Sequence, residues 1–332
     1  MDIARYVMAF LVLIGHFNGL TGSDVFINLT AESVGGFFAL SGFLMYPSFL
    51  KARNIRQYIG DRARRILPPY VFTVILCAFG LSLFSTLPAI DYFSDSGFWK
   101  YLAANLTFLN WLHPGLPGVF QGPDFAHYAV NGSLWTMKVE WCLYLSVPIM
   151  IWAIRKFRWN SIGAMITVIV MSILYRFGFT LLYEQTGNPI FEILGRQIFG
   201  QLSYFYCGML VYFAREWFDK YRRYIFVVSL LLYIATRDIP YATVFAAPML
   251  YSGIVLSFSM FRHAVPWVSR SNNISYNIYL LHYPIIQIAV YYGVNPECPW
   301  LPLAGVVAMT CLLSIVSITF VEKPFRRRPS GK

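Results

Sequence analysis

Ten apolar runs, most of them close to the length that crosses a lipid bilayer, constrain the fold of this chain more than any other feature. A transmembrane helix needs about 20 mostly apolar residues. Inside a bilayer the backbone must satisfy its own hydrogen bonds, which favours helices. The runs are residues 3–20, 31–50, 69–88, 135–154, 161–182, 197–213, 223–237, 240–260, 274–293 and 300–321. We therefore predict an all-α integral membrane protein with about ten transmembrane helices, with nine or eleven as the alternative counts.

The composition excludes the soluble, disordered and disulfide-rich classes. Hydrophobic residues make up 58% of the 332 and charged residues only 12%, about half the charged share of a soluble domain. The five cysteines are scattered without ligand spacing, so we predict neither a disulfide framework nor a metal site. The first apolar run lacks the pattern of a cleavable signal peptide and is interpreted as a permanent span.

The distribution of Lys and Arg predicts the orientation. With the N-terminus in the cytoplasm, the inner segments are residues 51–68, 155–160, 214–222, 261–273 and 322–332. Twenty basic residues lie in or beside these segments and six lie elsewhere, as expected when positive charge collects in cytoplasmic loops. We predict that both termini are cytoplasmic and that the protein is a multi-pass protein of the cytoplasmic (inner) membrane. The formal charge of +11 is thereby explained without nucleic acid as a partner.

The outer loops are short except for residues 89–134, which combine acidic, aromatic and turn-forming residues. This segment is too polar to span and too aromatic for a simple linker, so we expect it at the outer membrane face, partly re-entrant or interfacial. The chain shows no internal repeat and no low-complexity tract. We expect residues 1–332 to form a single polytopic domain with no appended soluble domain.

Ionisable side chains inside predicted spans indicate function, because burying them costs several kcal/mol. Arg5 and His16 are eleven residues apart in the first span, about three helical turns and roughly 16 Å along one face. The alternative is an interfacial Arg that extends towards water and a structural His bonded to a neighbouring helix. Glu140 lies in the outer third of the fourth span, where it would orient or charge an imidazole or pair with a cation. A structural ion pair is its alternative.

Three further groups are candidates with plain structural alternatives. Ser41 lies among small residues of the second span, which would admit a ligand or, more simply, a packed helix. Ser275, Tyr279 and His282 share a face of the ninth span, although Tyr is also common at membrane interfaces. Arg62 and Arg65 would project from one side if their stretch is helical, and a pair of guanidinium groups suits bidentate phosphate binding. Positive-inside topology or contact with anionic membrane lipid explains them equally well.

Several motifs, taken in order and spacing, resemble those of the acyltransferase-3 family of integral membrane O-acyltransferases. They are Asp2, Arg5 and His16; FFALSGFLM at 37–45; Arg62 and Arg65; SLWTMKVEWCLYL at 133–145; FYCGML at 205–210; SYNIYLLHYP at 275–284; and VEKPFRR at 321–327. The resemblance runs nearly end to end. It implies transfer of an acyl group, expected to be acetyl, from acyl-CoA to a hydroxyl of a surface polysaccharide or glycolipid of a bacterial cell envelope.

The resemblance also implies roles for the candidate residues. Arg62 and Arg65 match the motif associated with the acyl-CoA donor, and Arg5 and His16 match the motif thought to be catalytic. His16 would act as general base, Glu140 would orient it, and Arg5 would hold the donor or stabilise the oxyanion. Transient acylation of His16 is the alternative route. Ser41, Ser275, Tyr279 and His282 are the candidate substrate contacts, acetyl-CoA is a co-substrate, and no permanently bound cofactor is expected.

Some relatives carry an extracytoplasmic hydrolase-like domain for which this chain offers no segment. We expect the protein to act alone, with a separate extracytoplasmic partner, or on an acceptor that needs no second catalytic unit. The rival interpretation is a transporter or flippase of an envelope glycoconjugate, since buried His, Arg and Glu are common there. Such proteins often show inverted repeats, which this sequence lacks. A non-catalytic scaffold leaves the ordered polar motifs unexplained.

Overall fold

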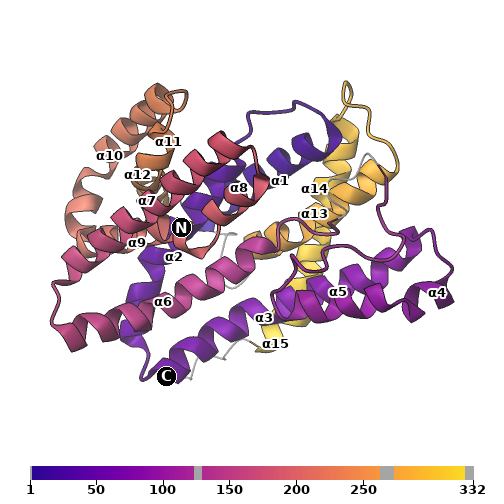
Figure 1. Cartoon of the computed structure of the whole chain (residues 1–332), viewed down its shortest axis with the longest axis horizontal. Coiled ribbons are helices and arrows are strands. Elements are labelled where there is room, and N and C mark those ends of the chain that lie inside the picture. Colours follow the sequence, from indigo (N-terminus) through magenta and orange to yellow (C-terminus); the bar gives the residue numbers. More distant parts are fainter. Residues whose placement is uncertain (1, 123–128, 262–272, 326–332) are drawn as a thin grey trace. The chain divides into compact units, whose positions relative to one another are not determined.

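A computed structural model describes residues 2–122, 129–261 and 273–325, and every regular element in them is helical (Figure 1). In chain order the elements are α1 (Asp2–Thr21), α2 (Thr30–Lys51), α3 (Ile55–Gly80), η1 (Leu81–Phe84), α4 (Ala89–Ser94), α5 (Ser96–Leu106), α6 (Trp135–Phe157), α7 (Ser161–Thr186), α8 (Pro189–Gly195), α9 (Ile198–Phe213), α10 (Arg215–Thr236), α11 (Ala242–Phe245), α12 (Ala247–Met260), α13 (Ser275–Tyr291), α14 (Trp300–Val316), the π-helical turn η4 (Ser317–Glu322) and α15 (Lys323–Phe325). The predicted all-α class is confirmed.

Six helical segments of the described chain are long and apolar enough to cross a membrane. They are Asp2–Thr21, Thr30–Lys51, Ile55–Phe84, Trp135–Phe157, Ser161–Thr186 and Trp300–Phe325. Ala247–Met260 is a shorter apolar helix. The other predicted spans also coincide with helices, α9, α10 and α13. The count of ten and the cytoplasmic termini stay predictions.

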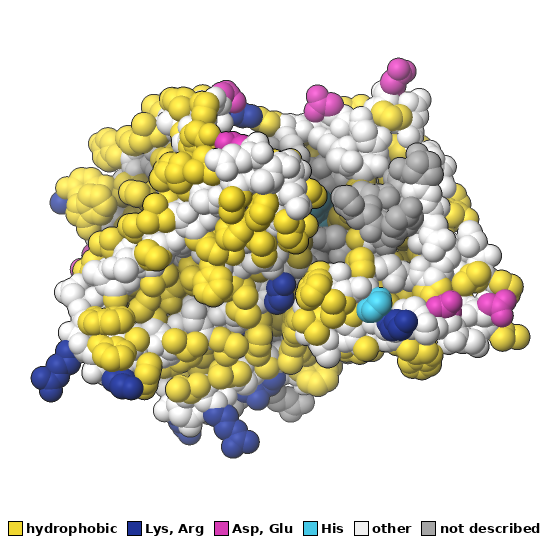
Figure 2. All heavy atoms as spheres, in the orientation of Figure 1, with side chains coloured by type: hydrophobic (Ala, Val, Ile, Leu, Met, Phe, Trp, Pro, Cys, Tyr) yellow, Lys and Arg dark blue, Asp and Glu magenta, His cyan; other side chains and the backbone are white. Residues whose placement is uncertain are grey.

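Apolar side chains on the outside of these helices indicate that they face lipid. Large hydrophobic residues of α7, such as Ile166 and Met171, and of α10, such as Leu231 and Ile234, are exposed. Figure 2 shows a face largely covered by hydrophobic side chains, with Lys, Arg, Asp and Glu as scattered single side chains. A soluble monomer rarely exposes so much contiguous apolar surface, so the fold is that of a multi-pass membrane protein.

The chain forms two compact units. The first comprises Met1–Met8, Ala31–Ile59 and Val139–Val268, and the second comprises Ala9–Thr30, Gly60–Lys138 and Ser269–Lys332. Four helices, α1, α2, α3 and α6, therefore contribute residues to both units, α2 only through Thr30 at its start. The expectation of one polytopic domain over residues 1–332 stays a prediction.

In the first unit α7 packs on α9, α9 on α12 and α12 on α10. Glycines allow α2 and α9 to approach closely. A Cβ added at Gly42 would overlap the carbonyl oxygen of Phe205, and one at Gly208 would overlap that of Ala39. The small residues of the second span thus serve helix packing at these positions.

In the second unit α13 packs on α14, and tyrosine hydroxyls join α3 to the helices of the predicted outer loop. Tyr92 of α4 donates to the carbonyl of Ala78 at 2.7 Å, and Tyr70 donates to that of Asn105 at 2.5 Å. The described part of the loop, residues 89–122 and 129–134, therefore contains the helices α4 and α5, and α5 is too short to span a bilayer. Its place at the outer membrane face stays a prediction.

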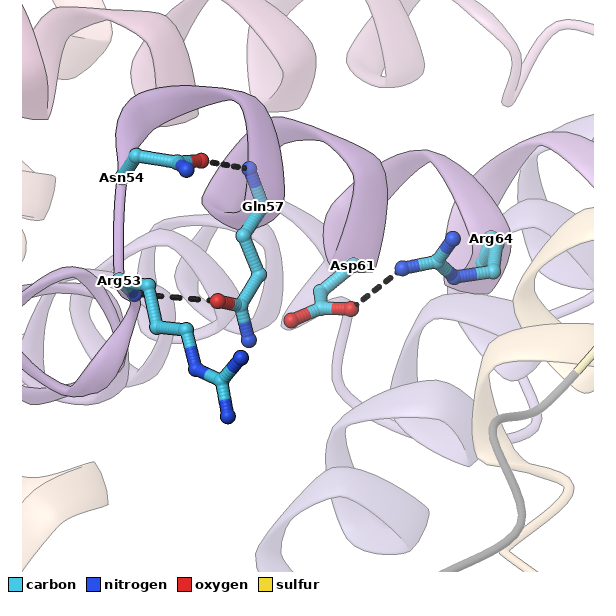
Figure 3. A network of polar contacts seen from close by, with 5 residues as sticks. All are labelled: Arg53, Asn54, Gln57, Asp61 and Arg64. Carbon is cyan, nitrogen blue, oxygen red and sulfur yellow. Dashed lines mark hydrogen bonds and ion pairs between the residues drawn. The ribbon is translucent and has the colours of Figure 1, made fainter.

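Helix α3 begins well before the apolar run that the sequence analysis assigned to the third span. Asn54 accepts a hydrogen bond from the backbone N–H of Gln57 at 2.8 Å, and the Gln57 side chain accepts from the backbone N–H of Arg53 at 3.1 Å (Figure 3). This reciprocal arrangement is a variant of the capping box that starts helices. The basic residues from Arg56 to Arg65 consequently lie in the first turns of α3.

Candidate active site

A proline inside α13 lies beside a group of buried polar side chains in the second unit. Pro284 has no N–H, so the carbonyl four residues earlier, that of Leu280, loses its helical donor. Asn131 replaces that donor with its side-chain amide at 2.8 Å. Ser133 donates to the neighbouring carbonyl of Tyr279 at 3.2 Å. The segment that precedes α6 therefore holds α13 in place at its proline.

The two histidines of the predicted site lie against each other in this unit. Nδ1 of His16 on α1 is 2.8 Å from Nε2 of His282 on α13, and the rings stack with centroids 5.1 Å apart. His282 is fully buried, whereas His16 is only partly buried. The second ring nitrogen of His282, Nδ1, lies 3.0 Å from the carbonyl oxygen of Ile278. Both ring nitrogens of the buried His282 thus have hydrogen-bond partners, and one of these partners is His16, which retains accessible surface.

Tyr283 covers the edge of this imidazole pair. Its ring meets His16 edge-on, with centroids 5.2 Å apart, and is also close to His282. A Cβ added at Gly132 would lie 2.7 Å from the Tyr283 ring, so the absence of a side chain at position 132 lets the loop pass this close. The rotamer of Tyr283, and with it the packing around both imidazoles, depends on that glycine.

The other two candidates on the predicted face of α13 have partners of their own. The Tyr279 and Thr136 hydroxyl oxygens are 2.9 Å apart, and both residues are buried. Ser275 lies at the first residue of α13 and donates its hydroxyl to the Asn273 side chain at 2.6 Å. The structure thus places these hydroxyls in separate hydrogen bonds along the same helix.

Glu140 and Ser41, both in the first unit, are connected by a residue that the sequence analysis did not single out. Tyr144, one turn after Glu140 on α6, donates its hydroxyl to the Glu140 carboxylate. The Ser41 hydroxyl on α2 lies 3.5 Å from the same Tyr144 oxygen. Tyr58 donates to the Tyr144 carbonyl at 3.2 Å, which Pro148 leaves without its helical donor.

Arg5 also belongs to the first unit, while His16 on the same helix α1 belongs to the second. Arg5 pairs with Asp2, with an N–O distance of 3.7 Å. The two residues are three positions apart, so the continuous helix brings both side chains to one side.

Because α3 is helical through Arg62 and Arg65, these residues, three positions apart, lie on one side of the helix. Both residues retain solvent exposure, and Arg65 is the more exposed. Between them, Arg64 bonds to Asp61 at 2.6 Å (Figure 3). Among the described residues, no group of three or more His, Cys, Asp and Glu side chains is arranged to hold a metal ion.

Tyr144 and Asn131 are the residues that sequence reasoning missed. Each is neutral, so a search for charged groups inside spans passes over them. A signal was present for Asn131, because Pro284 lies inside α13 and frees the carbonyl of Leu280. Pro148 likewise frees the carbonyl of Tyr144, but the donor that this predicts is Tyr58, and nothing in the sequence indicated the contacts of the Tyr144 hydroxyl. A buried proline of this kind predicts that some side chain elsewhere must supply a donor.

The exposed apolar side chains of the long helices indicate a multi-pass membrane protein. The chain belongs to the acyltransferase-3 family, because the family model described as an acyltransferase domain matches residues 1–322. The resemblance noted in the motifs is thereby confirmed.

Two relatives match over nearly their whole length. An O-acetyl transferase of Shigella phage Sf6 is 26% identical over 347 residues, covering 100% of this chain and 97% of that protein. Nodulation protein 10 of Rhizobium leguminosarum bv. viciae is 24% identical over 363 residues, covering 97% of this chain and 92% of that protein. No solved structure matched the chain.

Proposed function

We propose that this protein is a membrane O-acetyltransferase that moves an acetyl group from acetyl-CoA to a hydroxyl of a surface polysaccharide or glycolipid. The observation that carries the proposal is the partly buried His16 imidazole, hydrogen-bonded to the buried His282 in a chain of an acyltransferase family. The name of the phage relative, an O-acetyl transferase, supports acetyl as the acyl group.

The chemistry requires an alcohol to attack a thioester. His16 takes the proton of the acceptor hydroxyl while the hydroxyl oxygen attacks the acyl carbon. The new C–O bond forms, the C–S bond breaks, and CoA leaves as a thiolate that receives the proton from His16. A well-placed base contributes about 10²- to 10⁴-fold to such a step. Transient acylation of His16 is a second route with the same products.

The other candidates take supporting roles in this proposal. Arg62 and Arg65 bind the phosphates of CoA through their guanidinium groups. Arg5 holds the donor or stabilises the charge that develops on the carbonyl oxygen. Glu140, held by Tyr144, orients the reacting groups. Substrate contacts at Ser41, Ser275 and Tyr279 stay predictions.

The proposed topology places the two substrates on opposite sides. Ten spans with both termini in the cytoplasm would present Arg62 and Arg65 to cytoplasmic CoA and the 89–134 segment to an outer acceptor. The acyl group would cross the membrane while CoA stays inside. CoA is then a co-substrate rather than a bound cofactor, and the protein acts alone or with a separate extracytoplasmic partner.

Donor turnover by the purified full-length protein in nanodiscs tests the proposal. Radiolabelled acetyl-CoA and a surface-glycan extract are supplied, and both CoA release and labelled glycan are measured. We expect His16→Ala to lower transfer by about 10²-fold or more and Arg62→Ala to raise the KM for acetyl-CoA.

Two matched controls accompany these variants. His113→Ala removes an exposed loop imidazole, and Arg64→Ala removes a guanidinium that bonds to Asp61. Both should transfer at the wild-type rate. Absence of CoA release from acetyl-CoA and from other acyl-CoA donors by the wild type would contradict the proposal and favour a transporter or flippase.

A further inference from the structure

The partners of His282 determine which of its nitrogens carries the proton. The carbonyl oxygen of Ile278 can only accept a hydrogen bond, and it lies 3.0 Å from His282 Nδ1. Nδ1 must therefore donate. A neutral imidazole carries one proton, so Nε2 of His282 is an acceptor.

The same reasoning then determines which nitrogen of His16 carries the proton. Its Nδ1 lies 2.8 Å from the accepting Nε2 of His282, so Nδ1 of His16 must be the donor. The single proton of neutral His16 is used in that bond, and its Nε2 keeps a free lone pair. Two hydrogen bonds, one to a helix carbonyl and one between rings, thus leave a single tautomer for the neutral pair.

The packing holds His282 in this arrangement. The ring is fully buried, so a rotation that turned Nδ1 away from Ile278 would leave polar nitrogens without water as a substitute partner. The ring of Tyr283 meets both imidazoles edge-on. Asn131 anchors the carbonyl of Leu280, two residues before His282 on the same helix.

We propose that His282 is a positioning residue that fixes His16 as the Nδ1–H tautomer and makes its Nε2 the basic nitrogen, an inference that rests on the proposed function. During transfer the acceptor proton moves to Nε2 of His16, and the resulting imidazolium still donates from Nδ1 to His282. The proton then passes from Nε2 to the sulfur of CoA. His282 neither gains nor loses a proton.

Nitrogen-15 NMR of the full-length protein labelled at histidine tests this assignment without any need for activity. The chain has five histidines, so single His→Gln replacements assign the signals. We expect His16 to show a protonated Nδ1 and a bare Nε2. A protonated Nε2 on neutral wild-type His16 would overturn the proposal, whatever the folding of any variant.

Two variants of His282 separate positioning from simple packing. In His282→Gln the side-chain amide reaches the place of Nε2, and its oxygen can accept from His16. In His282→Asn the amide ends near the place of Nδ1, within reach of Ile278 but short of His16. We expect the Gln variant to keep the His16 tautomer and the Asn variant to lose it.

The kcat of each variant should depend on whether His16 keeps the Nδ1–H tautomer. We expect kcat to fall by about 10²-fold or more in His282→Asn, with the KM for acetyl-CoA within about threefold, and His282→Gln to retain most of the kcat. An unchanged His16 tautomer in the Asn variant, or equal loss of kcat in both folded variants, would overturn the positioning role. A wild type with the expected tautomer that transfers no acyl group would contradict the proposed function and leave the positioning arrangement supported.

Discussion

Tyr144 connects Glu140 and Ser41, which are 99 positions apart in the sequence and lie on different helices. Its hydroxyl donates to the Glu140 carboxylate and lies beside the Ser41 hydroxyl. A hydrogen bond to a charged group contributes about 1.5–3 kcal/mol, so this contact is strong enough to set the direction of the carboxylate. Tyr144 is therefore the residue through which the function of Glu140 can be examined without changing its charge.

We expect Tyr144→Phe to lower acetyl transfer by about tenfold, because the loss of about 1.4 kcal/mol of orientation energy corresponds to that factor. Initial rates of CoA release from the purified variant would measure it. Tyr206→Phe is the matched control: it removes a buried hydroxyl that bonds to Ser146 in the same unit. Equal rates in the two variants would show that the bond to Glu140 has no part in transfer.

Single residues also show how far the sequence alone leads to the site. The sequence singles out His16, His282 and Glu140 because an ionisable group inside a span is costly and so indicates function, and their roles stay predictions. The contact between the two histidines could not be predicted, because His16 and His282 are 266 positions apart and helical periodicity relates only residues of one helix. The spacing along α13 grouped His282 with Ser275 and Tyr279, while the structure pairs its ring with a residue of α1.

At the level of elements, α13 depends on a side chain from outside the helix. Pro284 removes the donor to the Leu280 carbonyl, and Asn131 supplies another. A proline inside a membrane helix is tolerated when a neighbouring group satisfies the freed carbonyl in this way. The shape of α13 around His282 is consequently set jointly by residues 131–133 and by the proline.

Asn131→Ala should lower the free energy of unfolding by about 1–3 kcal/mol, since the buried Leu280 carbonyl loses its donor. In a Pro284→Ala background the restored N–H can donate to that carbonyl, so the same Asn131→Ala change should cost measurably less. Thermal unfolding of the wild type, the two single variants and the double variant in one detergent gives the coupling energy between Asn131 and Pro284. Additive effects would show that Asn131 stabilises the protein by some other contact.

The sequence predicted most elements and misplaced the start of one. Hydrophobic length sufficed for α1, α2, α6 and α7, whose bounds lie within a few residues of the predicted runs. It failed for α3, because the helix begins with polar residues capped by Asn54 and contains Pro68 and Pro69. A hydropathy pattern identifies only the apolar part of a helix. It cannot identify the charged first turns of α3, which follow the Asn54 cap.

For the whole molecule, the exposed apolar side chains and the pattern of basic residues together predict on which side of the membrane each connection lies. Helix α7 allows a direct test. α6 ends at Phe157 and α7 runs from Ser161 to Thr186, so two short connections flank one long apolar helix. The connection before α7 follows Arg155 and Lys156, and positive charge favours the cytoplasm. The two ends of α7 should therefore lie on opposite sides of the membrane.

A reporter inserted at residues 158–160 should be active only in the cytoplasm, and one inserted at residues 187–188 only outside it. Paired cytoplasmic and extracytoplasmic reporters in intact cells would measure both positions. Insertion at residues 52–54, between α2 and α3, serves as an independent inner position. The same side for residues 158–160 and 187–188 would contradict a membrane-spanning α7 and the count of ten.

The two units share α1, α2, α3 and α6, and this interleaving has a consequence for the synthesis of the chain. No single cut separates one unit from the other, because each draws segments from early, middle and late parts of the sequence. During synthesis the second unit stays incomplete until its last segment, which begins at Ser269, leaves the ribosome. Deletion of the early, middle or late part of the chain would therefore remove residues from both units.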